Sequence, residues 1–145
     1  MNEKTIYKGI DVKERPWFIF LHKKGRGATF LGRIYLRKDL FKDYLAGSPS
    51  VETISVLEHE TTHFLNSGGK NVFKSIVHNL CYWLFPNFRF DEELRAIKSE
   101  MKVLKTNNQT FDIEKRAKFL SSFYYLYSSS YQRAHQELTR LWNEV

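Results

Sequence analysis

Chain-breaking residues constrain the fold of this chain more than any other feature. A Gly-Gly pair at 68–69 and a proline at 86 divide its second part into segments of helical length. Ser48-Pro49 is typical of a helix start, with a capping serine and proline at the first helical position. A helix that begins there is expected to end before the glycines. The helices predicted from these signals cover about 39–45, 49–66, 71–85, 90–105 and 112–143, the last either continuous or broken near 128–130.

The N-terminal part has the composition of strands. Residues 16–21 and 28–36 are rich in aromatic and β-branched side chains, and the loop between them at 23–27 contains two glycines and three basic residues. We therefore predict an α+β fold that is mostly helical, with a small antiparallel N-terminal hairpin packed on the active-site helix and further C-terminal helices. At 145 residues, we expect a single domain over 1–145, with a basic β-rich part at 1–47 and a helical part at 48–145.

The positive charge is concentrated at the N-terminal end. The net charge is +7, and residues 1–47 hold 11 Lys and Arg against 5 Asp and Glu. Such a cluster attracts nucleic acid, an anionic membrane or an acidic protein. A lysine-rich surface that serves solubility is the simpler interpretation, and an acidic or anionic partner of the basic hairpin is the alternative.

Cysteine content and hydropathy exclude several classes of protein. Cys81 is the only cysteine, so neither an internal disulfide nor a cysteine-based zinc finger can form. The longest apolar run, 76–85, is too short for a transmembrane helix and contains His78 and Asn79. The N-terminus has no apolar signal-peptide segment. We therefore expect a soluble cytoplasmic protein without a transmembrane segment.

The predicted helix over 49–66 contains an H-E-x-x-H sequence at 59–63. Residues four apart share one face of a helix, so His59 and His63 can bind one zinc ion, with Glu60 as the general base for a water molecule. On a helical wheel these histidines lie opposite an apolar face, which can pack into the core. That face consists of Ile54, Leu57, Phe64 and Leu65.

A catalytic zinc site needs a third protein ligand and an open position. No histidine follows at the spacing H-E-x-x-H-x-x-G-x-x-H, so we sought a carboxylate on the predicted helix over 90–105. Glu93 and Glu100 lie at the margin of its apolar stripe, with the small Ala96 between them, whereas Glu92 points nearly the other way. We favour Glu93 as the third ligand, with Glu100 as its chief rival.

These residues resemble the motifs of a known group of enzymes. H-E-x-x-H at 59–63 followed by Glu93-Leu94-Arg95-Ala96 is similar to the gluzincin metallopeptidases, whose later glutamate often lies in an E-x-x-A motif. The small size of the chain resembles that of the minigluzincins. The spacing of 30 residues from His63 to Glu93 resembles the spacing in the anti-repressor peptidases. The resemblance covers 50–66 and 90–100. Many such families have an aspartate or asparagine directly after the alanine to orient a ligand histidine, but this chain has Ile97.

The resemblance implies zinc-assisted hydrolysis of a peptide or protein, with one zinc ion held by His59, His63 and Glu93. Glu60 would take a proton from the attacking water and pass it to the leaving amine. The resemblance also implies an upstream edge strand that binds the substrate, for which 28–36 is the candidate. A group that stabilises the oxyanion is expected as well. Candidates on the C-terminal helices are His135, Tyr124, Tyr127 and Tyr131.

Two other functions are compatible with these patterns. One is a metal-binding regulatory or interaction protein with little catalysis, and replacing Glu60 with Gln would separate it from a peptidase. The other is a nucleic-acid-binding module that uses the basic hairpin and its aromatic residues. That module predicts strongly salt-dependent binding, which a peptidase does not require.

Overall fold

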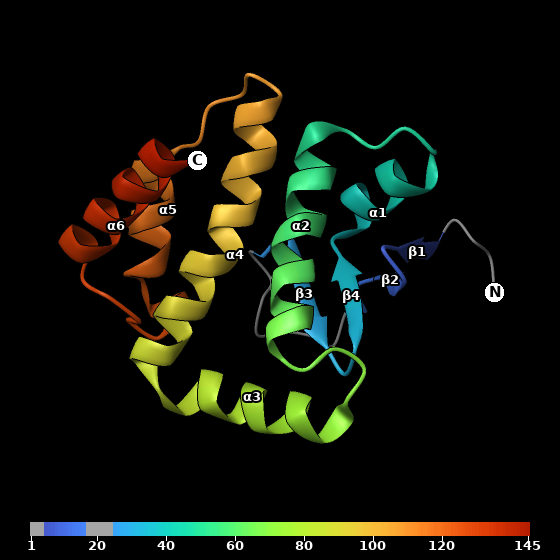
Figure 1. The fold of residues 1–145 in the computed structure, drawn as a ribbon, viewed down its shortest axis with the longest axis horizontal. Helices are drawn as coiled ribbons and strands as arrows, with labels where there is room; N and C mark the ends of the chain where they lie inside the picture. Colours follow the sequence, from blue (N-terminus) through green and yellow to red (C-terminus); the bar gives the residue numbers. More distant parts are fainter. Residues whose placement is uncertain (1–4, 17–24) are drawn as a thin grey trace.

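A computed structural model describes residues 5–16 and 25–145 of the chain. Within these ranges a small sheet lies beside a set of helices (Figure 1), which confirms the predicted α+β class. The strands are β1 (Ile6–Tyr7), β2 (Ile10–Glu14), β3 (Gly27–Phe30) and β4 (Arg33–Leu36). The helices are α1 (Lys38–Leu45), α2 (Val51–Asn66), α3 (Val72–Leu84), α4 (Pro86–Thr106), α5 (Ile113–Leu120), the short 3-10 helix η3 (Phe123–Tyr125) and α6 (Tyr131–Glu144).

The sheet is mixed rather than purely antiparallel, so the prediction was wrong on this detail. Its strand order is β1-β2-β4-β3, with β2 and β4 parallel and the two outer pairs antiparallel. Within the described residues, β3 pairs with β4 alone and forms one edge of the sheet. This edge strand is the part of the sheet nearest to the candidate site.

The single strand predicted over 28–36 is a hairpin of β3 and β4. The chain reverses at Leu31-Gly32, where both residues have positive φ, 46° and 72°. Two-residue hairpin loops favour this conformation because its twist matches that of the strands, and glycine adopts it readily. Gly32 was therefore a turn signal inside the predicted strand. Residues 17–21 of the other predicted strand lie outside the described residues, and β1 and β2 were not predicted.

The helix boundaries follow the chain breaks with small differences. Helix α2 begins two residues later than predicted, because the side chain of Ser50 rather than Ser48 caps it, accepting a hydrogen bond from the Thr53 amide. Helix α3 ends before Pro86 as predicted, and α4 begins at that proline rather than near residue 90. The C-terminal segment forms two helices, and the interruption between them extends over 121–130.

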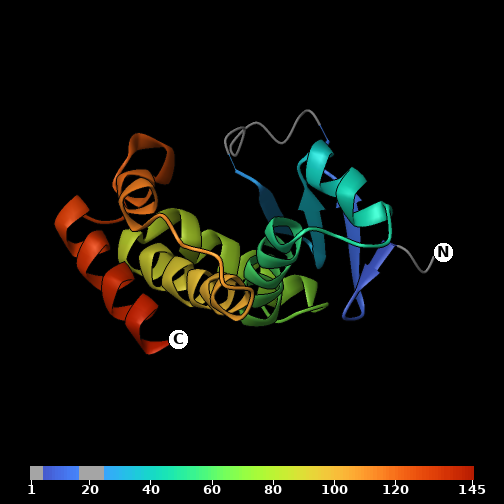
Figure 2. The same ribbon diagram turned by 90° about the horizontal axis from the view of Figure 1, so that it is seen from above.

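Helix α2 is sandwiched between the sheet and α4 (Figures 1 and 2). One apolar cluster joins the sheet, α1 and α2, and a second joins α4, α5 and α6. Because α2 is covered on two sides, its buried surface is wider than the single apolar face that was predicted. Ser55 and Thr61 are buried, whereas Leu65, assigned to the apolar face, is 66% exposed.

The helices carry no sign of a membrane span. Within the part of the chain that the structure describes, no helix is both long enough and apolar enough to cross a bilayer.

Candidate metal centre

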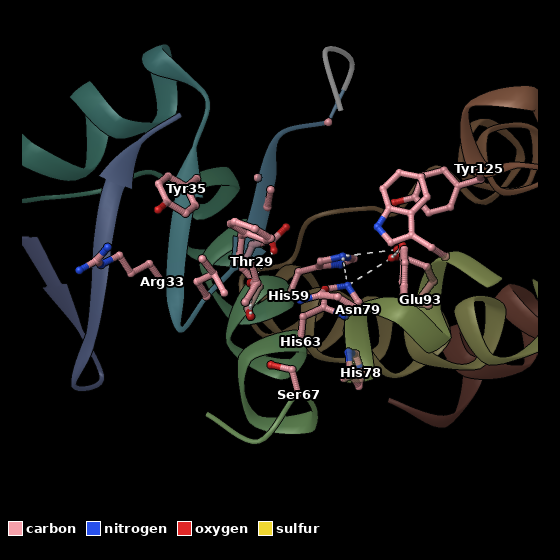
Figure 3. A pocket seen from close by; sticks show the side chains of 18 of the residues that line it. Thr29, Arg33, Tyr35, His59, His63, Ser67, His78, Asn79, Glu93 and Tyr125 are labelled. Atoms are coloured by element: carbon pink, nitrogen blue, oxygen red, sulfur yellow. Dashed lines mark hydrogen bonds and ion pairs between the residues drawn. The ribbon is translucent and has the colours of Figure 1, made fainter. Parts of the chain in front are cut away.

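Three potential metal ligands converge where α2 packs on α4 (Figure 3). The Nε2 atoms of His59 and His63 lie 3.2 Å apart. Glu93 from α4 completes the set, with Oε1 at 3.2 Å from His63 Nε2 and Oε2 at 3.6 Å from His59 Nε2. Tetrahedral zinc with bonds of about 2.0 to 2.1 Å requires ligand atoms about 3.3 Å apart, so this spacing fits one zinc ion.

The burial of these groups also favours a cation. Glu93 is 2% exposed, and its Oε2 atom is buried without a hydrogen-bond partner among the described residues. A buried carboxylate oxygen without a partner is costly unless it neutralises or coordinates a positive charge. The residues present therefore fit a metal ion, and the zinc expected from the sequence is compatible with this set of two imidazoles and one carboxylate.

Local helix geometry and helix packing together position the three ligands. The two histidines share a face of α2 because they are four residues apart. On α4, Ala96 is fully buried, in agreement with a close approach of the two helices. The hydroxyl of Thr62 on α2 donates to that of Ser99 on α4 at 2.8 Å, which links the helices one turn away from the site.

Glu100 supports the site from the opposite side of His59 instead of joining the ligand set. Its Oε2 lies 3.3 Å from His59 Nδ1, and its carboxylate also pairs with Arg26 and with Arg116, the latter at 2.9 Å. Burial alone would raise the pKa of Glu100, but Arg116, His59 and Arg26 outweigh it and hold this pKa well below its usual range. Glu100 thus forms an ion pair behind His59, at a place that Ile97 cannot fill, while His59 Nδ1 has no hydrogen-bond partner among the described residues.

The candidate ligands lie close enough together to shift one another's pKa values. Burial disfavours the charged imidazolium, but Glu100 and Glu93 outweigh burial and raise the pKa of His59 to about 9. Burial alone would raise the pKa of Glu93. The interactions with His63 and His59 outweigh burial, so the pKa of Glu93 lies well below its usual range. Both shifts favour an ion pair of a protonated His59 with the carboxylates beside it.

Tyr82 on α3 forms a hydrogen bond with Glu93, the third candidate ligand. Its hydroxyl donates to Glu93 Oε1 at 2.5 Å. Burial, together with the negative charge of Glu93, raises the pKa of Tyr82 well above its usual value, so the phenol remains a hydrogen-bond donor. Sequence reasoning missed Tyr82. A signal existed, because Ser75, His78 and Tyr82 form a polar stripe at helical spacing in this segment.

Glu60 lies under the edge strand β3. The Thr29 hydroxyl is 2.8 Å from Glu60 Oε2 and 2.9 Å from the Glu60 carbonyl oxygen. At Gly27 the strand passes so close that a Cβ atom would lie 2.9 Å from both Cγ and Oε1 of Glu60. Glycine is thus needed here for close approach, and β3 fixes the orientation of the predicted general base.

A pocket of about 640 Å³ connects these groups (Figure 3). His59, Glu60, His63 and Glu93 all line it. Residues 27–31 of the β3 hairpin form one wall, and Tyr82 and Trp83 of α3 contribute to the lining elsewhere. The mixture of an apolar lining with a few convergent polar groups is typical of a ligand-binding or catalytic pocket.

Three of the four predicted oxyanion stabilisers are not brought to this pocket. His135 and Tyr131 lie next to each other on α6, with ring centroids 5.8 Å apart, and Tyr127 is 66% exposed. None of these three lines the pocket, and the side chain of Tyr124 lies outside the described residues. The neighbouring Tyr125 does line it, and burial followed by the charge of Glu93 raises the pKa of its hydroxyl well above the usual value.

The choice among these tyrosines depends on irregular backbone. Leu126 and Tyr127 both have positive φ, so the chain turns sharply after η3. No periodicity specifies which side chain of such a turn points inward, and the sequence offered no signal for Tyr125.

Glu92 is buried as well, which corrects the prediction that it points away from the interior. Its Oε2 accepts a hydrogen bond from Asn66 at 3.0 Å and lies 3.1 Å from His78 Nε2, while Arg95 donates to Oε1. These partners, from α2, α3 and α4, satisfy Glu92, which is not one of the three candidate ligands. Helix α3 therefore supplies polar partners to Glu92 and Glu93, two of the three glutamates of α4.

Several arginines of the basic N-terminal part have partners within the protein. Arg26 pairs with Glu100, Arg15 donates to the Gly25 carbonyl oxygen, and Arg37 pairs with Asp39. These groups stabilise the hairpin and the site, which accounts for part of the local charge surplus. Residues 17–24, which carry Lys23 and Lys24 of the predicted basic loop, lie outside the described residues.

Comparisons of the chain with protein-family models, with curated proteins and with solved structures find no match. The function is therefore inferred from the chemistry of the site itself.

Proposed function

We propose that this chain is a zinc-dependent metallopeptidase of the gluzincin type. The observation that carries the proposal is the convergence of His59, His63 and Glu93 in a pocket that Glu60 also lines. Two imidazoles and a carboxylate form the three-ligand set typical of a catalytic zinc site, which leaves a position for water or substrate. Zinc bound there would supply Lewis acidity that polarises a peptide carbonyl and makes water more acidic.

The residues of the chain would divide the remaining work. Glu60 would take a proton from the attacking water and deliver it to the leaving amine, because it is the carboxylate of the pocket outside the ligand set. Thr29 would keep Glu60 in position through the hydrogen bond to Oε2. Tyr125 lines the pocket and its hydroxyl is protonated at neutral pH, so this hydroxyl would donate to the developing oxyanion.

The edge strand β3 would bind the substrate backbone. Ala28 and Thr29 line the pocket, and within the described residues β3 has a partner on one side only. An extended peptide can add to such an edge through main-chain hydrogen bonds, which selects for unfolded or extended segments rather than for one side chain. This accounts for a protein or peptide substrate in preference to a small molecule.

Two variants test the proposal when compared with the wild type. The protein is loaded with zinc, its metal content is measured, and hydrolysis of a fluorogenic peptide library is followed. Glu60→Gln is expected to retain about one zinc per chain and to lose at least about a hundredfold in kcat/KM. Glu93→Gln is expected to lose zinc as well as hydrolysis.

The outcomes separate the alternatives. Zinc binding without hydrolysis of any library member by the wild type would favour a metal-binding regulatory protein. Equal activity of wild type and Glu60→Gln would exclude Glu60 as the general base. No zinc in the wild type after reconstitution would contradict the metal site altogether.

A further inference from the structure

Helix α3 has its polar side turned toward the protein. Ser75 is 2% exposed, Tyr82 donates to Glu93, and His78 lies beside Glu92. Surface helices of globular proteins usually bury their apolar face and expose the polar one. Helix α3 reverses this arrangement because its inner face provides partners for Glu92 and Glu93 of α4.

The apolar side of α3 is consequently exposed to solvent. We define the outer stripe of α3 as five apolar side chains, which recur at intervals of three and four residues. They are Phe73, Ile76, Val77, Leu80 and Leu84. Their exposed fractions run from 44% for Val77 to 76% for Phe73. None of the five belongs to either buried apolar cluster.

The position of α3 leaves the outer stripe accessible. Figure 1 shows the helix lying crosswise at one end of the molecule, beyond the ends of α2 and α4. At its C-terminal end, Arg89 donates to the carbonyl oxygens of both Trp83 and Tyr125, which holds the η3 turn beside α3. Phe123 and Tyr127 of that turn are 69% and 66% exposed and extend the apolar surface.

Exposed lysines precede and begin helix α3. Residues 67–90 contain no aspartate or glutamate, and they include the exposed Lys70 and Lys74. The chain as a whole carries a net charge of +7. A second copy of the chain would bring the same positive charge to the stripe, whereas an anionic lipid surface has the opposite charge and an apolar interior.

We propose that the outer stripe of α3 lies in the interface of an anionic lipid membrane and docks the protein there. A helix with a phenylalanine- and leucine-rich face inserts that face at the boundary between headgroups and acyl chains, and neighbouring lysines attract anionic headgroups. Docking of this kind requires no membrane span. It is independent of the proposed hydrolysis, since none of the five side chains is a candidate ligand or base.

Vesicle sedimentation tests the proposal with the full chain. Vesicles of phosphatidylcholine alone are compared with vesicles that also contain about 30% phosphatidylserine, each at low and high salt. The test variant is Phe73→Ser combined with Leu80→Ser. The control is Leu45→Ser, which removes an exposed leucine from α1 at 36% exposure. Circular dichroism and zinc content check that each variant keeps its fold.

The expected result is binding to the anionic vesicles that weakens with salt, falls at least about tenfold in the double variant and is unchanged in Leu45→Ser. Failure of the wild type to bind anionic vesicles would overturn the proposal, and so would equal binding by a correctly folded double variant. Sedimentation velocity without lipid provides a further check. A wild-type dimer that the double substitution dissociates would overturn the proposal in favour of a second copy on this face.

Discussion

Glu100 Oε2 lies 3.3 Å from His59 Nδ1, on the side of the imidazole away from the Nε2 atom that faces His63 and Glu93. The same carboxylate pairs with Arg26 from the β3 end of the sheet and with Arg116 from α5. The Glu100 side chain therefore links His59 to the sheet through Arg26 and to α5 through Arg116. A second carboxylate behind a histidine of this kind sets its tautomer and increases its basicity as a ligand.

Glu100→Gln is expected to lower zinc affinity by about ten- to a hundredfold without abolishing binding, because His59 loses its orienting partner but the three ligands remain. It should also reduce the free energy of unfolding by about 3 kcal/mol, since Arg26 and Arg116 lose a buried counter-charge. Competition with a chelating indicator and denaturant titration measure the two effects. Complete loss of zinc in this variant would instead make Glu100 a ligand.

Thr29→Val should reduce kcat/KM by at least about tenfold while zinc content stays at the wild-type level. The valine has nearly the shape of threonine but cannot donate to Glu60 Oε2, so the general base loses its fixed orientation. Thr29→Ser keeps the hydroxyl and is the matched control, with activity near that of wild type. Similar activity in both variants would show that this hydrogen bond does not position Glu60.

Tyr125→Phe should lower kcat by about a hundredfold with little change in KM, because a donor to the oxyanion acts in the transition state and not in substrate binding. Tyr127→Phe removes the same hydroxyl two residues away on an exposed side chain and should have no effect. Steady-state kinetics on one peptide substrate compare the two. A larger loss in Tyr127→Phe than in Tyr125→Phe would contradict the assignment.

The stability of the metal-free protein should fall as pH rises from about 6.5 to 9. The pKa of His59 is raised from 6.5 in the unfolded chain to about 9 in the fold. A group with a raised pKa contributes its full stabilisation below the unfolded value and loses it as pH passes through the folded value. The loss is expected to reach about 3 kcal/mol and to be absent in His59→Gln. Denaturant titrations of the metal-free proteins across this range measure it.

Zinc should reverse this trend, because the metal displaces the proton from His59. At pH 7.5, zinc binding is therefore expected to release about one proton from this residue, measured by calorimetry in buffers of different ionisation enthalpy. Zinc binding with no proton release would show that His59 is already neutral in the metal-free protein.

Local patterns of the sequence were enough to pair the two histidines of the site. Two histidines four residues apart lie on one face of any helix, so His59 and His63 could be paired before the fold was known. The glycines at 68–69 and Pro86 likewise ended α2 and α3 where expected, because their backbone preferences act over one or two residues. The helical wheel of α4 placed both Glu93 and Glu100 at the margin of its apolar stripe, and only the packing of α4 on α2 brings Glu93 to the two histidines.

Tertiary structure decided the features that depend on residues distant in the chain. The sheet order, with β2 parallel to β4 and β3 at the edge, results from pairing between segments that no local period relates. Glu100 lies beside His59, and its carboxylate pairs with both Arg26 and Arg116, which are distant from each other in the chain. Tyr125 faces the pocket through an irregular turn. The sequence predicted the helix at α3, but only Glu92 and Glu93 of α4 explain why its polar side chains lie inside, since a buried carboxylate must have polar or charged partners.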